Sequence, residues 1–145
     1  MKKIIPLLGM LMLVQHLASQ NWQTDFATAQ QLAGEKQQAI VLVFQGSDWC
    51  APCMKLEREI FDTDEFKTYA QKHLVMLKAD FPRRKKNKLS NEQEAHNRKL
   101  AEKYNTEGYF PLVVVMDSTG KVLGKLGYEN VSVANYIKKI EGIIK

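Results

Sequence analysis

The feature that most constrains the fold is a pair of cysteines placed between a strand pattern and a helix pattern. Cys50 and Cys53 are the only two cysteines of the 145-residue chain, and Ala51 and Pro52 separate them. Residues 39–44, AIVLVF, form a continuous β-branched and aromatic run, which is typical of a strand buried on both faces. Small and polar residues end this run, and an amphipathic helical pattern follows the cysteines. The pair is therefore expected at a strand-to-helix junction.

The spacing of the cysteines favours chemistry over mechanical stabilisation. A disulfide stabilises most when it closes a long loop, and a bridge between Cys50 and Cys53 closes almost none. Unpaired N–H groups and the helix dipole at a helix N-terminus favour a thiolate, the attacking species in thiol–disulfide exchange. We therefore predict Cys50 as the exposed nucleophile and Cys53 as the more buried resolving thiol. Pro52 is tolerated early in the helix, and Ser47 or Asp48 is expected to cap its first turn.

A zinc site is the main alternative for a C-x-x-C motif. Zinc needs four ligands, and the sequence has neither a second C-x-x-C nor a pair of closely spaced histidines. His73 and His96 lie far apart in the sequence and are expected at the surface or at helix ends. No metal is therefore predicted for this chain.

The first twenty residues have the pattern of a secretory signal peptide. MKK supplies a positive start, IIPLLGMLMLV an apolar segment, and QHLASQ a more polar end with small residues. A retained membrane anchor is less favoured, because the apolar segment is shorter than the roughly 20 residues of a spanning helix and contains Pro6 and Gly9. We therefore predict a signal peptide at 1–20 and a mature domain at 21–145, in the periplasm or outside a bacterial cell.

The mature chain is predicted to form one α/β domain, with a central mixed sheet of about four strands flanked by helices. Apolar periodicity and capping signals predict helices at 22–36, directly after Cys53, at 61–72, at 90–104 and from Ser132 onward. Strands are predicted at 39–44, 74–80, 111–117 and 121–127. The last two strands are expected to form a hairpin across the turn sequence DSTG.

The charge of the chain is modest and partly local. The formal net charge of +5 includes two lysines of the leader, and the remainder is too small to indicate a nucleic-acid partner. A polar insert at residues 82–92 carries a block of five cations within RRKKNK. We expect a solvated loop there, with docking of a partner or an anionic surface as the alternative. Glu92 and Glu94 follow closely and argue against a polyanion site.

Two stretches resemble the thioredoxin family, namely VLVFQGSDWCAPCMKLE and GYFPLVVVMDSTGKVLGKLGY. Together with the order of the elements, the resemblance covers roughly residues 22–145, and it is greatest to the small exported bacterial members. It implies the thioredoxin fold and a redox-active Cys50–Cys53 disulfide with no further cofactor. Proteins of this kind act on other proteins through their cysteines.

The resemblance also assigns roles to residues around the cysteines. It implies that Pro111 is cis and packs against the two sulfurs. The backbone of Phe110 is then expected to pair with an extended substrate peptide, as in strand addition. Trp49 and Pro52 are expected to form part of the apolar rim that contacts the substrate, although simple packing also accounts for Trp49.

One departure from the family pattern concerns proton transfer. Thioredoxins carry a buried aspartate six positions before the first cysteine, where this chain has Phe44. A lysine that neighbours this aspartate in the family corresponds to Met76. We expect an apolar pocket in place of the charged pair, with water or the leaving thiolate of the substrate accepting the proton of Cys53.

The resulting expectation is an exported thiol–disulfide oxidoreductase that reduces disulfides in periplasmic proteins. Ala-Pro between the cysteines is close to the Gly-Pro of reducing thioredoxins and lacks the histidine of many oxidants and isomerases. A periplasmic reductase needs electrons from across the membrane, so a membrane thiol reductant is an implied partner. No stable membrane insertion is expected once the signal is removed. The alternatives are a disulfide oxidase or isomerase, and a non-catalytic module that binds peptides beside Phe110 and Pro111.

Overall fold

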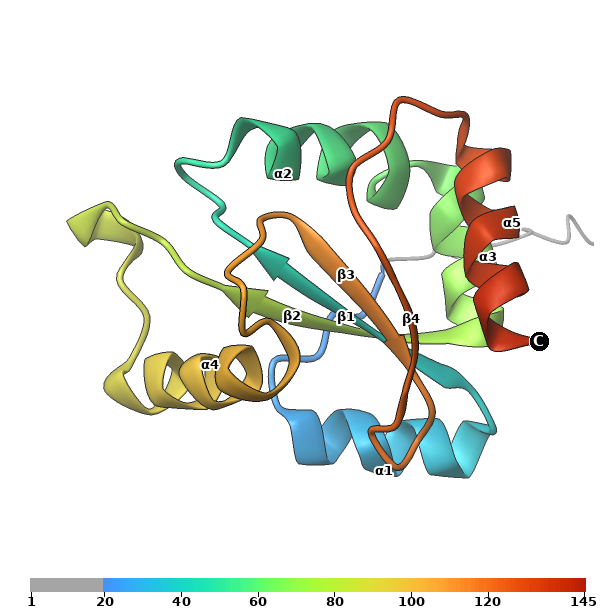
Figure 1. Cartoon of the computed structure of the whole chain (residues 1–145), viewed down its shortest axis with the longest axis horizontal. Coiled ribbons are helices and arrows are strands. Elements are labelled where there is room, and N and C mark those ends of the chain that lie inside the picture. Colours follow the sequence, from blue (N-terminus) through green and yellow to red (C-terminus); the bar gives the residue numbers. More distant parts are fainter. Residues whose placement is uncertain (1–19) are drawn as a thin grey trace, which may run out of the picture.

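The computed structural model describes residues 20–145, which fold around a four-stranded sheet (Figure 1). Its strands are β1 (Ala39–Gln45), β2 (Leu74–Asp80), β3 (Leu112–Met116) and β4 (Val122–Leu126). The strand order is β2-β1-β3-β4. Strands β1 and β2 are parallel, whereas β3 is antiparallel to both β1 and β4. The prediction of an α/β domain with a mixed sheet of about four strands, ending in a hairpin, is therefore confirmed.

The predicted signal peptide lies outside the described residues, apart from its last position. From residue 20 onward, the chain contains no helix with the length and apolar character needed to cross a bilayer.

Helices cover both faces of the sheet (Figure 1). One face packs against α1 (Phe26–Lys36) and α4 (Asn91–Tyr104). The other packs against α2 (Ala51–Leu56), α3 (Asp64–His73) and α5 (Val133–Ile144). Two short segments complete the fold: the π-helical turn η1 (Glu57–Phe61) after α2 and the 3₁₀ turn η2 (Lys85–Asn87) before α4. The result is a three-layer sandwich, as expected for apolar elements on both sides of a sheet.

The alternation of side chains along β1 divides the core into two clusters. Val41 and Val43 point toward α2, α3 and α5, whereas Ile40, Leu42 and Phe44 point toward α1 and α4. All five are at most 1% exposed. This explains why the sequence of β1 is apolar at successive positions, because both faces of a central strand are buried.

The first helix begins later than predicted, at Phe26 instead of residue 22. Residues before it run alongside β2, where the Gln23 N–H donates to the Met76 carbonyl oxygen at 2.8 Å. Asp25 then caps the helix, since its carboxylate accepts the Thr28 N–H at 2.8 Å. Residues 22–25, which helical periodicity had assigned to the helix, therefore precede it, and Gln23 pairs with the edge strand β2 instead.

The topology brings three segments of the chain to one end of the sheet. Strands β1 and β2 are parallel, so both finish at the same end of the sheet. The segments that follow them, residues 46–50 and 81–88, therefore start from that end. Strand β3 is antiparallel to β1 and starts beside the end of β1, with Leu112 paired to Phe44. Residues 110–111 therefore also lie at this end of the sheet, and the candidate site is formed there.

Candidate active site

The two cysteines lie at the N-terminus of α2, as the sequence predicted. Cys50 is the N-cap residue, and its Sγ accepts the backbone N–H of Cys53 at 3.3 Å. Pro52 lies within the first turn of the helix, where an N–H group has no intrahelical partner, so the missing N–H of proline costs no hydrogen bond. The sulfur of Cys50 thus faces the unpaired amide groups that favour a thiolate.

Cys50 and Cys53 form a disulfide, with their Cα atoms 5.2 Å apart. Each cysteine is 4% exposed, so the predicted difference between an exposed Cys50 and a more buried Cys53 is not present in this oxidised form. Reduction of this disulfide yields two thiols one helical turn apart, which is the arrangement that a two-step exchange requires.

The peptide bond between Phe110 and Pro111 is cis, as the resemblance implied. The two residues directly precede β3, at the end of the sheet where α2 begins. The ring centroids of Phe110 and Trp49 are 5.4 Å apart in an edge-to-face arrangement, which joins the segment before β3 to the residue before Cys50.

Trp49 belongs to an aromatic cluster beside the disulfide. Its indole N–H donates to the Phe81 carbonyl oxygen at 2.7 Å. The rings of Phe81 and Phe110 are 5.5 Å apart, again edge-to-face. Phe81 was not predicted as a site residue, because its contact with Trp49 arises only when β1 and β2 lie side by side.

Gly46 leaves the space that the Trp49 ring occupies. A Cβ atom at Gly46 would lie 2.2 Å from the ring, a distance that real Cβ contacts do not reach. We expect Gly46→Ala to displace the indole and to lower the rate of disulfide reduction by about tenfold or more, since small misplacements at active sites have effects of that size. Indole fluorescence in a Trp22→Phe background and steady-state turnover would measure the two effects.

The matched control is Gly34→Ala, because nothing lies within 4 Å of a Cβ at that position in α1. It is expected to leave turnover and fluorescence unchanged and to stabilise the helix by about 0.5–1 kcal/mol. An unshifted indole spectrum with normal turnover in Gly46→Ala would contradict the assigned role of Gly46.

Neither Ser47 nor Asp48 caps α2, contrary to the prediction, because Cys50 itself is the N-cap residue. Ser47 instead contacts the end of β2, where its backbone N–H and hydroxyl donate to the Asp80 carboxylate at 2.9 and 2.6 Å. Asp48 binds the segment after β2. Its carboxylate accepts the N–H groups of Arg83 and Arg84 at 2.9 and 3.0 Å and the side-chain amide of Asn87 at 2.9 Å.

These hydrogen bonds, the Arg83 N–H first among them, lower the pKa of Asp48 to about 2. A group with a lowered pKa in the folded state stabilises that state above its unfolded pKa of about 3.9, and this stabilisation is lost as the pH falls toward the folded value. We therefore expect Asp48→Asn to reduce the free energy of unfolding equally at pH 5 and pH 8. The difference from wild type should shrink between about pH 4 and pH 2, as measured by urea unfolding. A difference as large at pH 2 as at pH 5 would contradict this assignment.

The family aspartate and lysine positions do not share a pocket in this chain. Phe44 is buried toward α1 and α4, whereas Met76 is buried toward α2 and α3, on the opposite face. A charged pair nevertheless lies on the α2 side, where Lys78 Nζ is 2.9 Å from the carboxylate of Glu57, one helical turn after Cys53. Lys78 also lies 4.4 Å from the ring centre of Trp22.

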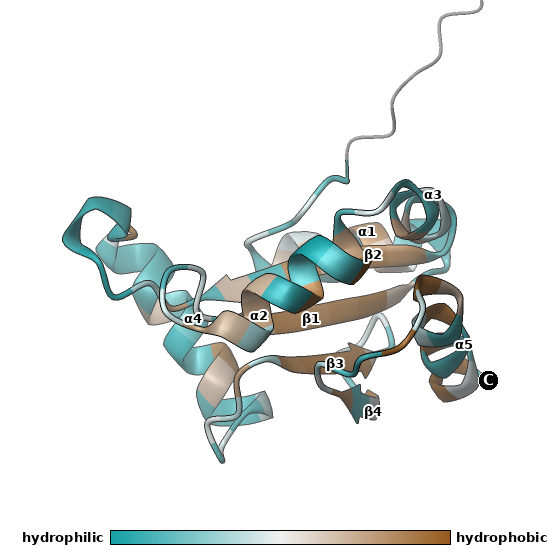
Figure 2. Cartoon of the chain, turned by 90° about the horizontal axis from the view of Figure 1, so that it is seen from above, coloured by the Kyte–Doolittle hydropathy of each residue, from teal (hydrophilic) through white to brown (hydrophobic). Residues whose placement is uncertain are grey.

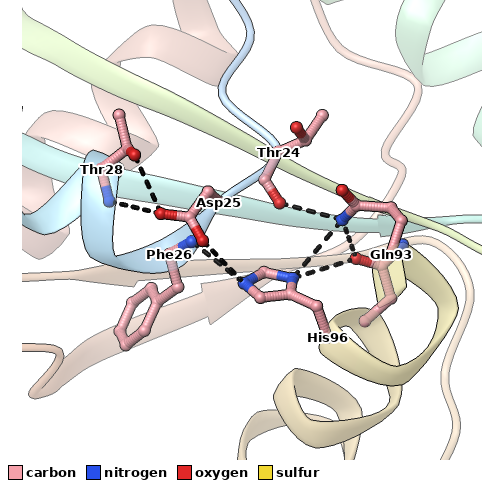
Figure 3. Close-up of polar contacts among 7 residues, drawn as sticks. Thr24, Asp25, Phe26, Thr28, Gln93 and His96 are labelled. Carbon is pink, nitrogen blue, oxygen red and sulfur yellow. Dashed lines mark hydrogen bonds and ion pairs between the residues drawn. The ribbon is translucent and has the colours of Figure 1, made fainter. Parts of the chain in front are cut away.

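The two histidines outside the leader, His73 and His96, contact neighbouring groups of the fold. Figure 3 shows the His96 ring of α4 beside the start of α1, where its Nε2 accepts the Phe26 N–H at 3.1 Å. The side chain of Gln93 lies 3.5 Å from the other ring nitrogen. His73 ends α3 and lies against Tyr69, with ring centroids 4.8 Å apart. Within residues 20–145, no three side chains of histidine, cysteine, aspartate or glutamate gather in a way that could hold a metal.

Comparison with curated proteins gives relatives whose names refer to disulfide reduction or to thioredoxin. DsbH, a disulfide bond reductase of Chlamydia pneumoniae, is 36% identical over 128 residues, which cover 88% of this chain and 75% of that protein. A thioredoxin-related protein of the same organism, DsbJ, is 32% identical over 60 residues, which cover 41% of this chain and 17% of DsbJ.

Comparison with solved structures supports the same grouping. The structure of a DsbH oxidoreductase aligns with a TM-score of 0.80 at 33% identity, covering 88% of this chain and 87% of that one. A thioredoxin of Thermus thermophilus has a TM-score of 0.63 at 14% identity, covering 87% and 88%, and shows the likeness of fold alone. A family model described as thioredoxin-like matches residues 21–118, which include both cysteines and Pro111. The chain therefore belongs to the thioredoxin-like family.

Proposed function

We propose that this protein is an exported thiol–disulfide oxidoreductase that reduces disulfides in periplasmic proteins. The observation that carries the proposal is the Cys50–Cys53 disulfide at the N-terminus of α2, directly after Trp49, whose ring contacts Phe110 before the cis Pro111. The relationship to a protein named as a disulfide bond reductase, at 36% identity, supports the direction of the reaction.

The reaction begins from the reduced protein. The Cys50 thiolate attacks one sulfur of the substrate disulfide, so the substrate S–S bond breaks and a mixed disulfide with Cys50 forms. The substrate's leaving thiolate takes up a proton. Cys53, after losing its proton to water or to that thiolate, attacks Cys50 and releases the second substrate thiol. Two electrons have then passed to the substrate, and Cys50 and Cys53 are joined as a disulfide.

The residues around the disulfide have proposed roles in holding the substrate. The backbone of Phe110 pairs with an extended peptide, and Pro111 keeps that peptide beside the sulfurs. Trp49 and Pro52 supply apolar contacts next to Cys50. The aromatic contact between Trp49 and Phe110 supports a single continuous binding surface for the peptide.

Regeneration needs a source of two electrons. We infer a membrane thiol reductant, a protein dithiol that receives electrons from the cytoplasm and passes them to Cys50 and Cys53. The signal-peptide pattern at 1–20 supports this location. The dithiol itself carries the electrons, so the reaction requires no further cofactor.

The redox equilibrium of the protein in defined thiol–disulfide buffers, read by trapping free thiols, tests this direction. A reduction potential near the thioredoxin value of about −270 mV is the expected result. A potential near about −120 mV would instead indicate a disulfide oxidase, and a value near about −180 mV an isomerase. In either case the reductase assignment would be wrong, although the roles of the two cysteines would stand.

A further inference from the structure

The cationic side chains of the basic insert are solvated, as expected, but its backbone is attached to the segment that precedes Cys50. We define the basic loop as residues 82–88, which connect β2 to α4 through η2. Figure 1 shows it at the same end of the sheet as the start of α2, and Figure 2 shows it as a hydrophilic arm that projects from the body. Its cations are all exposed; they are Arg83, Arg84, Lys85, Lys86 and Lys88.

The two residues before Cys50 fix the position of this loop. The carboxylate of Asp48 accepts three hydrogen bonds from the loop, and the indole of Trp49 donates to the carbonyl of Phe81 at its base. The guanidinium carbon of Arg83 lies 3.8 Å from the ring centre of Trp49, a cation–π contact. The backbone of the loop is therefore held to the residues before Cys50, and the Arg83 side chain lies against Trp49.

These cations form no side-chain ion pair within the part of the chain that the structure describes, although Arg83 lies over the Trp49 ring and Arg84 lies near the Asp48 carboxylate. The ion pairs between residues 20 and 145 join other side chains, and none includes a residue of the basic loop. The one carboxylate bound by the loop, Asp48, is occupied by backbone N–H groups and an amide. Glu92 and Glu94 follow in the first turn of α4 and form no ion pair with the loop. With five exposed cations and the single carboxylate of Asp48 bound to it, the loop therefore presents a net positive charge.

A groove connects the loop to the site. It runs between the segment before Cys50 and the segment before Pro111, and its lining residues are Trp49, Phe81, Pro82, Arg83, Gly108 and Phe110. A peptide that pairs with Phe110 and places its sulfur at Cys50 would continue along this groove toward the cations. Its lining combines aromatic and proline side chains with the cation of Arg83.

We propose that the basic loop selects substrate proteins whose disulfide-forming cysteine is flanked by an acidic segment. This inference rests on the proposed function, because it names the substrate class of the same site. Acidic side chains would meet Arg84, Lys85 and Lys86 while the aromatic groove holds the neighbouring residues. Opposite charge on a mobile partner raises the rate of encounter, and the effect is screened by salt.

The test uses three synthetic peptides with one disulfide each, identical except for three flanking glutamates, serines or lysines. The reduced protein should reduce the glutamate peptide about tenfold faster than the lysine peptide at about 50 mM salt, measured as kcat/KM. The difference should largely disappear at about 0.5 M salt, where the screening length is only a few ångströms. The triple substitution Arg84→Glu, Lys85→Glu, Lys86→Glu should remove or invert the preference and leave the serine peptide within about twofold of its wild-type rate.

The matched control reverses three exposed lysines on other elements, with Lys36→Glu, Lys72→Glu and Lys138→Glu. It makes the same change in net charge and should keep the preference for the glutamate peptide. If the control loses the preference as fully as the loop variant does, net charge and not the basic loop is responsible, and the proposal is wrong.

Two other outcomes would also overturn it. Equal reduction of all three peptides would show that the loop does not select substrates, while the proposed reductase activity would stand. If oxidised glutathione is reduced as fast as the glutamate peptide, with the same loss in the loop variant, the cations serve a small anionic disulfide and not a protein segment. Failure to reduce any peptide would contradict the proposed function itself.

Discussion

Cys53→Ser is expected to convert the protein into a trap that accumulates as mixed disulfides with its substrates. Cys50 keeps its place at the N-terminus of α2 in this variant and can still attack a substrate disulfide. The serine hydroxyl at position 53 cannot attack the mixed disulfide, so the covalent complex persists. Non-reducing gels of cells that express the variant should therefore show high-mass species that collapse to the free protein on reduction.

Cys50→Ser is expected to show neither trapping nor turnover. The rate of disulfide reduction should fall by at least about 10³-fold, a small part of the acceleration that enzymes commonly reach. The double variant Cys50→Ser, Cys53→Ser is the matched control for non-specific capture and should give no mixed disulfide. A non-catalytic peptide-binding module makes the opposite prediction: Cys50→Ser would retain function, and Cys53→Ser would trap nothing.

The position of the cysteine pair could be predicted from the sequence because every signal was local. The apolar run of β1, the break at Gly46 and the amphipathic pattern after Cys53 together indicate a strand-to-helix junction. The cis bond before Pro111 could not be derived from local pattern, because few X–Pro bonds are cis. It was available only from the resemblance of the surrounding stretch to a known family.

Features that depend on the pairing of strands were missed or misassigned. Asp48 has the sequence context of a helix cap, yet its partners lie 35 to 39 positions later, on the loop that follows the adjacent parallel strand. The same adjacency explains why the attachment of the first part of the 82–92 insert to Asp48 was missed, although its cations are solvated as predicted. One signal could have suggested the contact. A short polar side chain follows β1, and a long insert follows β2, the strand beside it.

The opposite orientation of Phe44 and Met76 has a similar cause. Each strand alternates with a period of two, but which residues share a face follows from the register between strands. In the structure Phe44 pairs with Ala79, and Met76 pairs with Val41. Alignment to the family pattern showed that Phe44 and Met76 replace the family aspartate and lysine. It could not show that these two side chains lie on different faces of the sheet.

Phe44→Ala is expected to be among the most destabilising substitutions in the chain. Phe44 is 0% exposed and stacks on Phe81 with ring centroids 6.5 Å apart, between β1 and the α1–α4 layer. Removing a buried phenyl ring costs about 3–5 kcal/mol through lost burial and a residual cavity. Urea unfolding of the oxidised protein, followed by fluorescence, would measure the loss. Phe44→Leu is the matched control, since it keeps most of the volume and is expected to cost about 1.5 kcal/mol or less.

Phe44→Asp is expected to be worse than Phe44→Ala, although it restores the residue that thioredoxins carry at this position. A carboxylate there would be buried among apolar side chains on the α1–α4 face, away from Met76 and from the Lys78–Glu57 pair. Burial of an unpaired carboxylate adds several kcal/mol to the cost of the lost ring, against a total stability of about 5–15 kcal/mol for typical domains. The variant should therefore be largely unfolded or insoluble. If it instead folds with near wild-type stability and reduces disulfides faster, position 44 faces Cys53, and the proton acceptor of the family operates in this chain as well.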